Sequence, residues 1–111
     1  PALRMMLDDA LRSRGAMVES VANGPDAVAL LRSRQERGKP FQVALVDMQL
    51  PGLRGSDVID AARAMDPMVR LVATSGLEPE PATAAQLKAA GASFLAKPFR
   101  LGEVVDALLG R

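Results

Sequence analysis

The sequence contains neither cysteine nor histidine. The absence of cysteine excludes disulfide bonds and metal sites with thiolate ligands. The absence of histidine excludes the usual zinc chemistry and catalysis by a serine–histidine pair. Any catalytic or metal-binding site in this chain must therefore be built without these two residue types.

The chain also lacks a long hydrophobic run, a signal peptide and a strong charge of either sign. No apolar stretch approaches the roughly 20 residues that cross a bilayer, and the N-terminus shows no signal-peptide pattern. The formal net charge is +1, so no broad basic surface argues for binding to nucleic acid or to a membrane. With 111 residues, 49% of them hydrophobic, we expect one domain, residues 1–111, located in the cytoplasm.

Apolar strands and amphipathic helices alternate along the chain. Four short apolar segments predict strands, at 17–21, 43–46, 71–74 and 93–96. Apolar residues at helical spacing predict helices around and between them, at 1–14, 24–34, 56–65, 83–90 and 101–109. Asn23 is expected to cap the second of these helices, and Gly55 or Ser56 the third. Such alternation is typical of a parallel sheet with helices on both faces.

Three polar residues stand at the carboxyl ends of the last three strands: Asp47, Ser75 and Lys97. Each is unremarkable alone, because such residues are common in turns and solvated loops. In a right-handed parallel sheet, however, these strand ends meet at one edge, where ligands of open α/β sheets bind. A carboxylate nucleophile, a hydroxyl and an ammonium group suit phosphoryl transfer to the carboxylate. Mg²⁺ would be needed to offset the remaining negative charge.

The sequence around these residues resembles the receiver domain of two-component response regulators. The similarity extends over the whole chain and includes Asn23-Gly24 before the second helix. It is concentrated in three segments, 43–55, 74–76 and 91–99. Any one of these is a weak signal, but their ordered combination is strong. The resemblance implies a flavodoxin-like, doubly wound parallel sheet with strand order 2-1-3-4-5.

The resemblance also implies a role for each polar strand-end residue. Asp47 would be the phosphoacceptor, Ser75 the switch hydroxyl and Lys97 the charge partner of the phosphoryl group. Phe94, three residues before the lysine, would be the aromatic switch residue. Pro98 would follow a cis peptide bond.

Two further positions of the family tune how fast the phosphoryl group is lost. Gln49 and Leu77 occupy them, two residues beyond Asp47 and Ser75. Both side chains are uncharged, and we expect Leu77 to hinder the attacking water. The backbone carbonyl of Gln49 would also join Asp47 as a ligand of Mg²⁺.

Receiver domains hold Mg²⁺ with a pair of adjacent acids that ends the first strand, just before the first helix. Asp8 and Asp9 are adjacent, but both fall inside the predicted helix 1–14, so we do not expect them to be this pair. The first, central strand and its acidic pair are therefore expected to be absent from a sequence that opens at Pro1. Three explanations remain: residues precede Pro1 in the protein, another chain fills the gap, or the sheet is rearranged. We expect the first.

The function implied is that of a phosphoacceptor in a two-component phosphorelay, not of an enzyme acting on a separate substrate. A sensor histidine kinase or phosphotransfer protein would phosphorylate Asp47, Ser75 would move inward, and Phe94 would follow. The face formed by the last helices and strand would then bind partners or a second copy, with helix 83–90 moving. A non-phosphorylated pseudo-receiver that serves as an interaction module is the main alternative. A flavin- or nucleotide-binding protein of the same fold is a more distant one.

Overall fold

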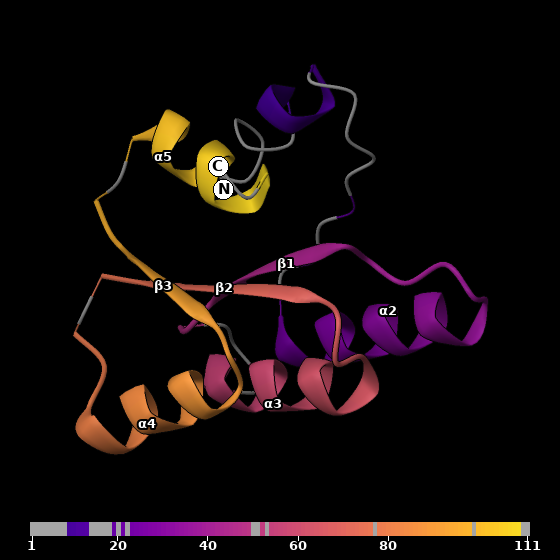
Figure 1. Ribbon diagram of the computed structural model, residues 1–111, viewed down its shortest axis with the longest axis horizontal. Helices are drawn as coiled ribbons and strands as arrows, with labels where there is room; N and C mark the ends of the chain where they lie inside the picture. The colour runs from indigo at the N-terminus through magenta and orange to yellow at the C-terminus, as the bar shows by residue number, and fades with distance from the viewer. Residues whose placement is uncertain are drawn as a thin grey trace.

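Three parallel strands form the sheet in the computed structural model, which describes residues 9–13, 19, 21, 23–49, 52, 54–76, 78–98 and 100–109. β1 (Val43–Asp47), β2 (Arg70–Ser75) and β3 (Ser93–Ala96) lie side by side in that order (Figure 1). They match three of the four predicted strands. The fourth, 17–21, falls almost wholly outside the described residues, and its two described members, Glu19 and Val21, are not in a strand.

Helices cover both faces of the sheet. α2 (Gly24–Glu36), α3 (Gly55–Met65) and α4 (Pro81–Ala89) lie on one face, and α5 (Leu101–Leu109) lies on the other (Figure 1). Residues 9–12 are helical as well. None of the helices in the described part of the chain has the length and apolar character that a membrane span requires. The parallel sheet with helices on both faces confirms the predicted fold class.

The core has two layers because alternate residues of a strand point to opposite faces. Leu71 and Ala73 of β2 pack in the layer under α3, together with Ile59. Val72, which lies between them in sequence, packs in the layer under α5 together with Val104. All five side chains are almost fully buried. β2 is therefore buried on both faces, and it lies between the other two described strands.

The first residues of the helices differ from their predictions in two places. Asn23 caps α2 as expected, because its side-chain oxygen accepts a hydrogen bond of 2.8 Å from the backbone N–H of Asp26. α3, in contrast, begins at Gly55 with Arg54 at the N-cap position, so the prediction that Gly55 or Ser56 caps it is wrong. α4 begins two residues early because Pro81 has a backbone geometry suited to the first turn.

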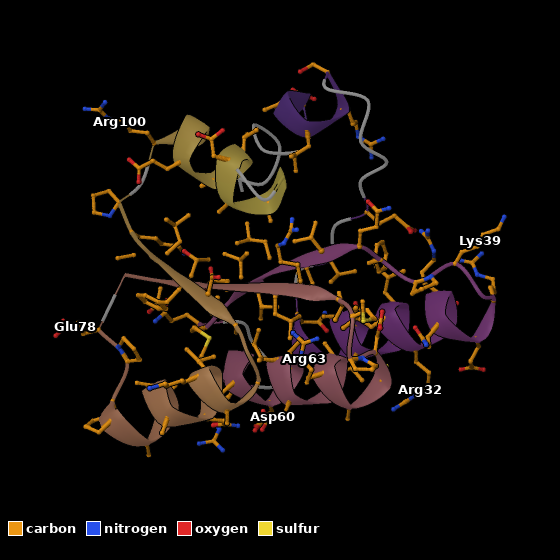
Figure 2. The ribbon with its side chains drawn as sticks, in the orientation of Figure 1. Arg32, Lys39, Asp60, Arg63, Glu78 and Arg100 are labelled. Atoms are coloured by element: carbon orange, nitrogen blue, oxygen red, sulfur yellow. The ribbon has the colours of Figure 1, made fainter. Side chains whose placement is uncertain are left out.

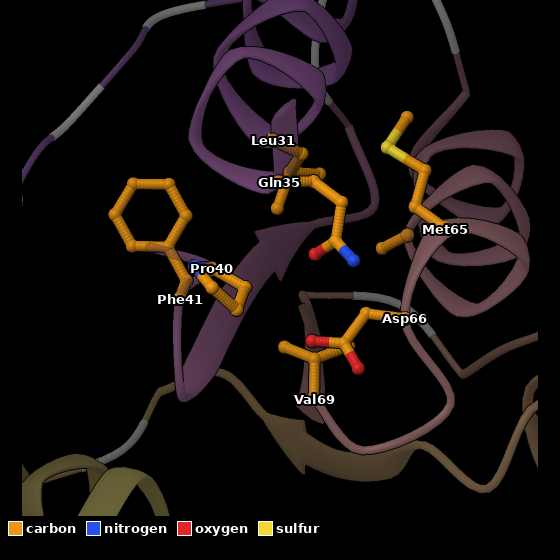
Figure 3. A pocket seen from close by; sticks show the side chains of 8 residues that line it. Leu31, Gln35, Pro40, Phe41, Met65, Asp66 and Val69 are labelled. Carbon is orange, nitrogen blue, oxygen red and sulfur yellow. The ribbon is translucent and has the colours of Figure 1, made fainter. Parts of the chain in front are cut away.

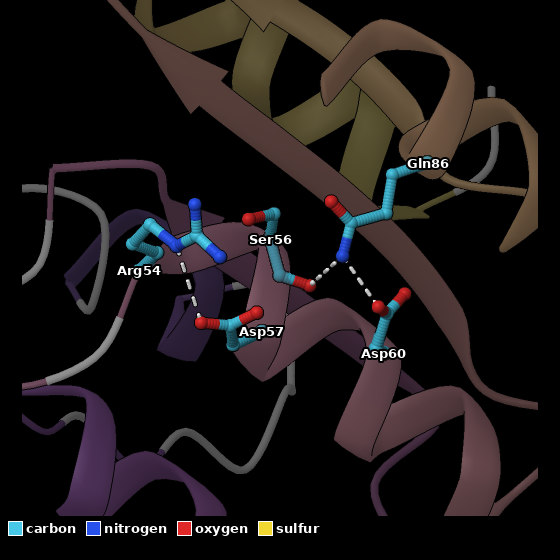
Figure 4. Close-up of polar contacts among 5 residues, drawn as sticks. All are labelled: Arg54, Ser56, Asp57, Asp60 and Gln86. Carbon is cyan, nitrogen blue, oxygen red and sulfur yellow. Dashed lines mark hydrogen bonds and ion pairs between the residues drawn. The ribbon is translucent and has the colours of Figure 1, made fainter. Parts of the chain in front are cut away.

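α4 is held only lightly against the rest of the fold. Leu87 is its one buried residue. Gln86 adds a polar link to α3, donating from Nε2 to the carboxylate of Asp60 and to the carbonyl of Ser56, the latter at 3.5 Å (Figure 4). Removing little apolar surface from water leaves a helix weakly anchored. α4 therefore has the packing expected of an element that can shift.

Candidate functional site

Asp47 ends β1, and each of its carboxylate oxygens has a partner. Oδ2 lies 2.8 Å from Nζ of Lys97, the residue that follows β3. Oδ1 accepts a hydrogen bond of 2.9 Å from the backbone N–H of Gln49. The side chains of Asp47 and Lys97 are 37% and 31% exposed. The carboxylate is thus held in a fixed position and remains open to a reactant from solvent.

Ser75 ends β2 and lies beside this ion pair. Its side chain is buried, and its hydroxyl oxygen accepts a hydrogen bond of 2.6 Å from Nε2 of Gln49. Gln49 therefore contacts Asp47 through its backbone and Ser75 through its side chain. The structure brings Asp47, Ser75 and Lys97 to one edge of the sheet, the carboxyl edge.

Backbone hydrogen bonds continue past the strand ends and hold the site loops in place. The N–H of Met48 donates to the carbonyl of Thr74 at 2.8 Å, and the N–H of Lys97 donates to the carbonyl of Ser75 at the same distance. The Lys97–Pro98 peptide bond that follows is cis. The phosphoacceptor candidate and its lysine are therefore both tied to β2.

Phe94 and Ser75 share one face of the sheet. Ala73 pairs with Phe94 and Ser75 with Ala96 in the β2–β3 register, and alternate residues of a strand point the same way. Phe94 is 37% exposed. The aromatic side chain thus lies on the same face as Ser75 and has further surface that it could bury.

The described residues do not by themselves make a complete Mg²⁺ site. They contain no group of three or more acidic side chains that could hold a metal ion. Asp9 is exposed in a helical segment, as its position predicted, and Asp8 lies outside the described residues. Asp47 and the carbonyl of Gln49 fall short of the octahedral set of oxygen ligands that Mg²⁺ requires. The cofactor therefore stays a prediction.

A hollow of about 310 Å³ opens at the carboxyl edge, between the starts of α3 and α4. Gln49, Ser75 and Arg54 are among the residues that line it. A second hollow lies at the opposite edge of the sheet, near Phe41 and Val69 (Figure 3). Its volume is about 10 Å³, which is no more than one water molecule needs. Of these two hollows among the described residues, the first has room for a reactant and the second does not.

Two contributions to the site were missed from the sequence. The sequence predicts that Gln49 lies near the phosphoacceptor and offers its backbone carbonyl, but it does not predict the side-chain bond to Ser75. The resemblance assigns no role to Arg54, although an arginine directly before a helix, where Ser, Thr, Asp or Asn prevails, is an available signal. Leu77, expected to hinder water, lies outside the described residues.

Comparison with known proteins agrees with this arrangement. The response regulator receiver domain family matches residues 1–109. The chemotaxis protein CheY of Thermotoga maritima is 30% identical over 96% of this chain and 85% of its own length. The crystal structure of a CheY-like receiver domain protein from Methanospirillum hungatei superposes with a TM-score of 0.84 over 98% of this chain and 83% of its own. At 21% identity, that likeness shows the fold alone.

A response regulator from Burkholderia pseudomallei, crystallised with a phosphorylated aspartic acid, a calcium ion and citrate, is 27% identical. Its TM-score is 0.79, over 96% of this chain and 60% of its own. This chain spans between 40% and 54% of the length of three regulatory proteins that it also matches. Sequence, fold and family match agree, and the chain belongs to the response regulator receiver domain family.

Proposed function

We propose that this receiver domain takes a phosphoryl group onto Asp47 as one step of a two-component phosphorelay. The contacts of Asp47 carry the proposal. Its carboxylate is accessible, lies 2.8 Å from the ammonium group of Lys97, and is linked through Gln49 to the hydroxyl of Ser75. An accessible carboxylate with a fixed cationic partner is suited to attack phosphorus.

The transfer is a substitution at phosphorus. One carboxylate oxygen of Asp47 forms a new bond to phosphorus, while the bond from phosphorus to the donor breaks and the donor keeps that electron pair. The donor is a phosphohistidine of a histidine kinase or phosphotransfer protein, or a small acyl phosphate. Lys97 would offset negative charge on the transferred group, and Ser75 would donate a hydrogen bond to one of its oxygens. The product is an acyl phosphate, and the chain acts as a phosphoacceptor rather than as an enzyme with a separate substrate.

The signal would leave the site through Ser75, Phe94 and α4. A phosphoryl oxygen is a new charged partner for the Ser75 hydroxyl, which now accepts from Gln49. Phe94 lies on the same face of the sheet, partly exposed, and α4 is lightly anchored. Movement of these three would reshape the surface of α4, β3 and α5, where a partner or a second copy would bind.

Phosphorylation of the full-length protein by acetyl phosphate tests this function. We expect a mass increase of one phosphoryl group that alkali removes, on a peptide that contains Asp47. Reactions with and without MgCl₂ test the predicted cofactor, because the label should form only when Mg²⁺ is present. A protein that stays unlabelled with acetyl phosphate and with phosphorylated kinases would contradict the proposal. It would favour the pseudo-receiver, which the incomplete metal site among the described residues already allows.

Lys97→Met is expected to slow phosphorylation of Asp47 by about ten- to a hundredfold. A hydrogen bond to a charged group contributes about 1.5–3 kcal/mol, and about 1.4 kcal/mol corresponds to a tenfold change in rate. The rate of label formation at a fixed acetyl phosphate concentration measures the effect. Lys39→Met is the matched control, because Lys39 is exposed and lies on the opposite side of the molecule from Glu78, which lines the hollow (Figure 2). Equal rates for the two variants would contradict the role of Lys97.

A further inference from the structure

Arg54 stands where an arginine contributes little to the helix that follows. It is the N-cap residue of α3, and its side chain makes no capping hydrogen bond. A guanidinium group has no acceptor to offer the free N–H groups of a first turn, whereas Ser, Thr, Asp and Asn do. Its side chain is 82% exposed and contacts Oδ2 of Asp57 at 3.3 Å (Figure 4). Surface ion pairs of this kind contribute little to stability.

The backbone beside Arg54 is packed directly against the phosphoacceptor. A Cβ atom added at Gly55 would lie 2.8 Å from the carbonyl oxygen of Asp47 and 2.5 Å from Cα of Met48. Arg54 therefore precedes a residue in contact with the end of β1. From there it lines the 310 Å³ hollow together with Gln49, the residue that bonds to Asp47.

The charges around the hollow make Arg54 the side chain that an anionic ligand would contact there. Of the described residues that line it, Arg54 is the only cation, and Glu78 and Glu80 are anions. Lys97 already faces the carboxylate of Asp47. A phosphodonor is itself anionic, so on entering the hollow it would meet two carboxylates and one cation, Arg54, before it reached Lys97 beside Asp47. Asp57 offsets part of that cation's charge but leaves it exposed.

We propose that Arg54 binds the phosphoryl group of the incoming donor and gives this receiver a preference for the more highly charged small phosphodonors. The inference rests on the proposed phosphorylation of Asp47. Guanidinium N–H groups match phosphate oxygens in a bidentate geometry. With acetyl phosphate, an oxygen of Asp47 bonds to phosphorus, and acetate leaves with the electron pair of the broken bond. Arg54 binds the phosphoryl oxygens of the donor as it enters through the hollow, and it exchanges no proton.

Arg54→Asn separates this role from a structural one. Asparagine supplies the missing N-cap acceptor, so the midpoint of thermal unfolding should rise. The rate of phosphorylation by acetyl phosphate should nevertheless fall about tenfold, the loss expected for one charge-assisted hydrogen bond. Phosphoramidate carries less negative charge at neutral pH, so its rate should fall by about threefold or less. Arg54→Lys keeps the charge but loses the bidentate geometry, so its rate with acetyl phosphate should fall less than that of Arg54→Asn.

Arg32→Asn is the matched control, because Arg32 is exposed on α2 at the opposite end from Glu78 (Figure 2). It should leave both rates unchanged. An Arg54→Asn protein that reacts with acetyl phosphate as fast as the wild type would overturn the inference. So would an equal slowing with both donors, because the effect would then not depend on donor charge. If the wild type itself takes no label, the proposed function fails. If the wild type is labelled and Arg54→Asn is labelled as fast, only the inference on Arg54 fails.

Discussion

Asp47→Asn is expected to take up no phosphoryl group from any donor. An amide does not supply the anionic oxygen that must bond to phosphorus. No second carboxylate among the described residues shares the contact with Lys97. Label measured by intact mass should therefore fall below detection, with acetyl phosphate and with a phosphorylated kinase alike.

The same substitution should change stability only slightly. The ion pair that it removes is about one-third exposed on both sides, and pairs of this kind contribute about 1 kcal/mol or less. A midpoint of thermal unfolding close to that of the wild type would show that the loss of label reflects chemistry and not unfolding. Glu103→Gln on α5, an exposed position, is the control and should be labelled normally. Label on the Asp47→Asn protein would place the phosphoacceptor elsewhere.

Gly55→Ala is expected to lower the free energy of unfolding by about 1–3 kcal/mol, the usual effect of overpacking. The added Cβ would lie 2.5 Å from Cα of Met48 and 2.8 Å from the carbonyl oxygen of Asp47. Both are backbone atoms, so no side-chain rotation relieves the overlap. α3 and the end of β1 must move apart, and phosphorylation of Asp47 should slow in the folded fraction. Equilibrium unfolding in urea measures the first effect and the rate of label formation the second.

Gly102→Ala gives the matched control with the opposite sign. Gly102 lies in α5, and a Cβ added there meets no atom within 4 Å. Replacing an unstrained helical glycine by alanine raises stability by up to about 1 kcal/mol. Gly102→Ala should therefore unfold at a higher urea concentration than the wild type, and Gly55→Ala at a lower one. A shift of both variants in the same direction would contradict the steric argument.

The sheet and the site could be predicted from the sequence to different depths. The strands can be predicted because short apolar runs such as 43–46 are typical of strands buried on both faces. The meeting of Asp47, Ser75 and Lys97 followed from the rule that parallel strand ends share one edge. These predictions rest on local composition and on topology. Neither depends on the position of any single side chain.

The details that failed depend on contacts between distant segments. The start of α3 was misplaced because its first residue is chosen by packing on Asp47 and Met48, which precede it by eight and seven residues. The bond from Gln49 to Ser75 joins residues 26 apart in sequence, and a glutamine side chain has too many rotamers for its target to be read from sequence. A position before a helix shows that Arg54 is unusual, but only the hollow shows what surrounds it.

The contact at Gly55 also determines which of the helices beside the site has space to move. The start of α3 abuts the backbone of Asp47 without space for one more carbon atom. The backbone of Asp47 therefore has no space to move toward α3 when a phosphoryl group is added to its side chain. The free volume lies in the 310 Å³ hollow between the starts of α3 and α4, which is bordered by Ser75 and by Thr83 of α4. We therefore expect α4, and not α3, to move if Asp47 is phosphorylated.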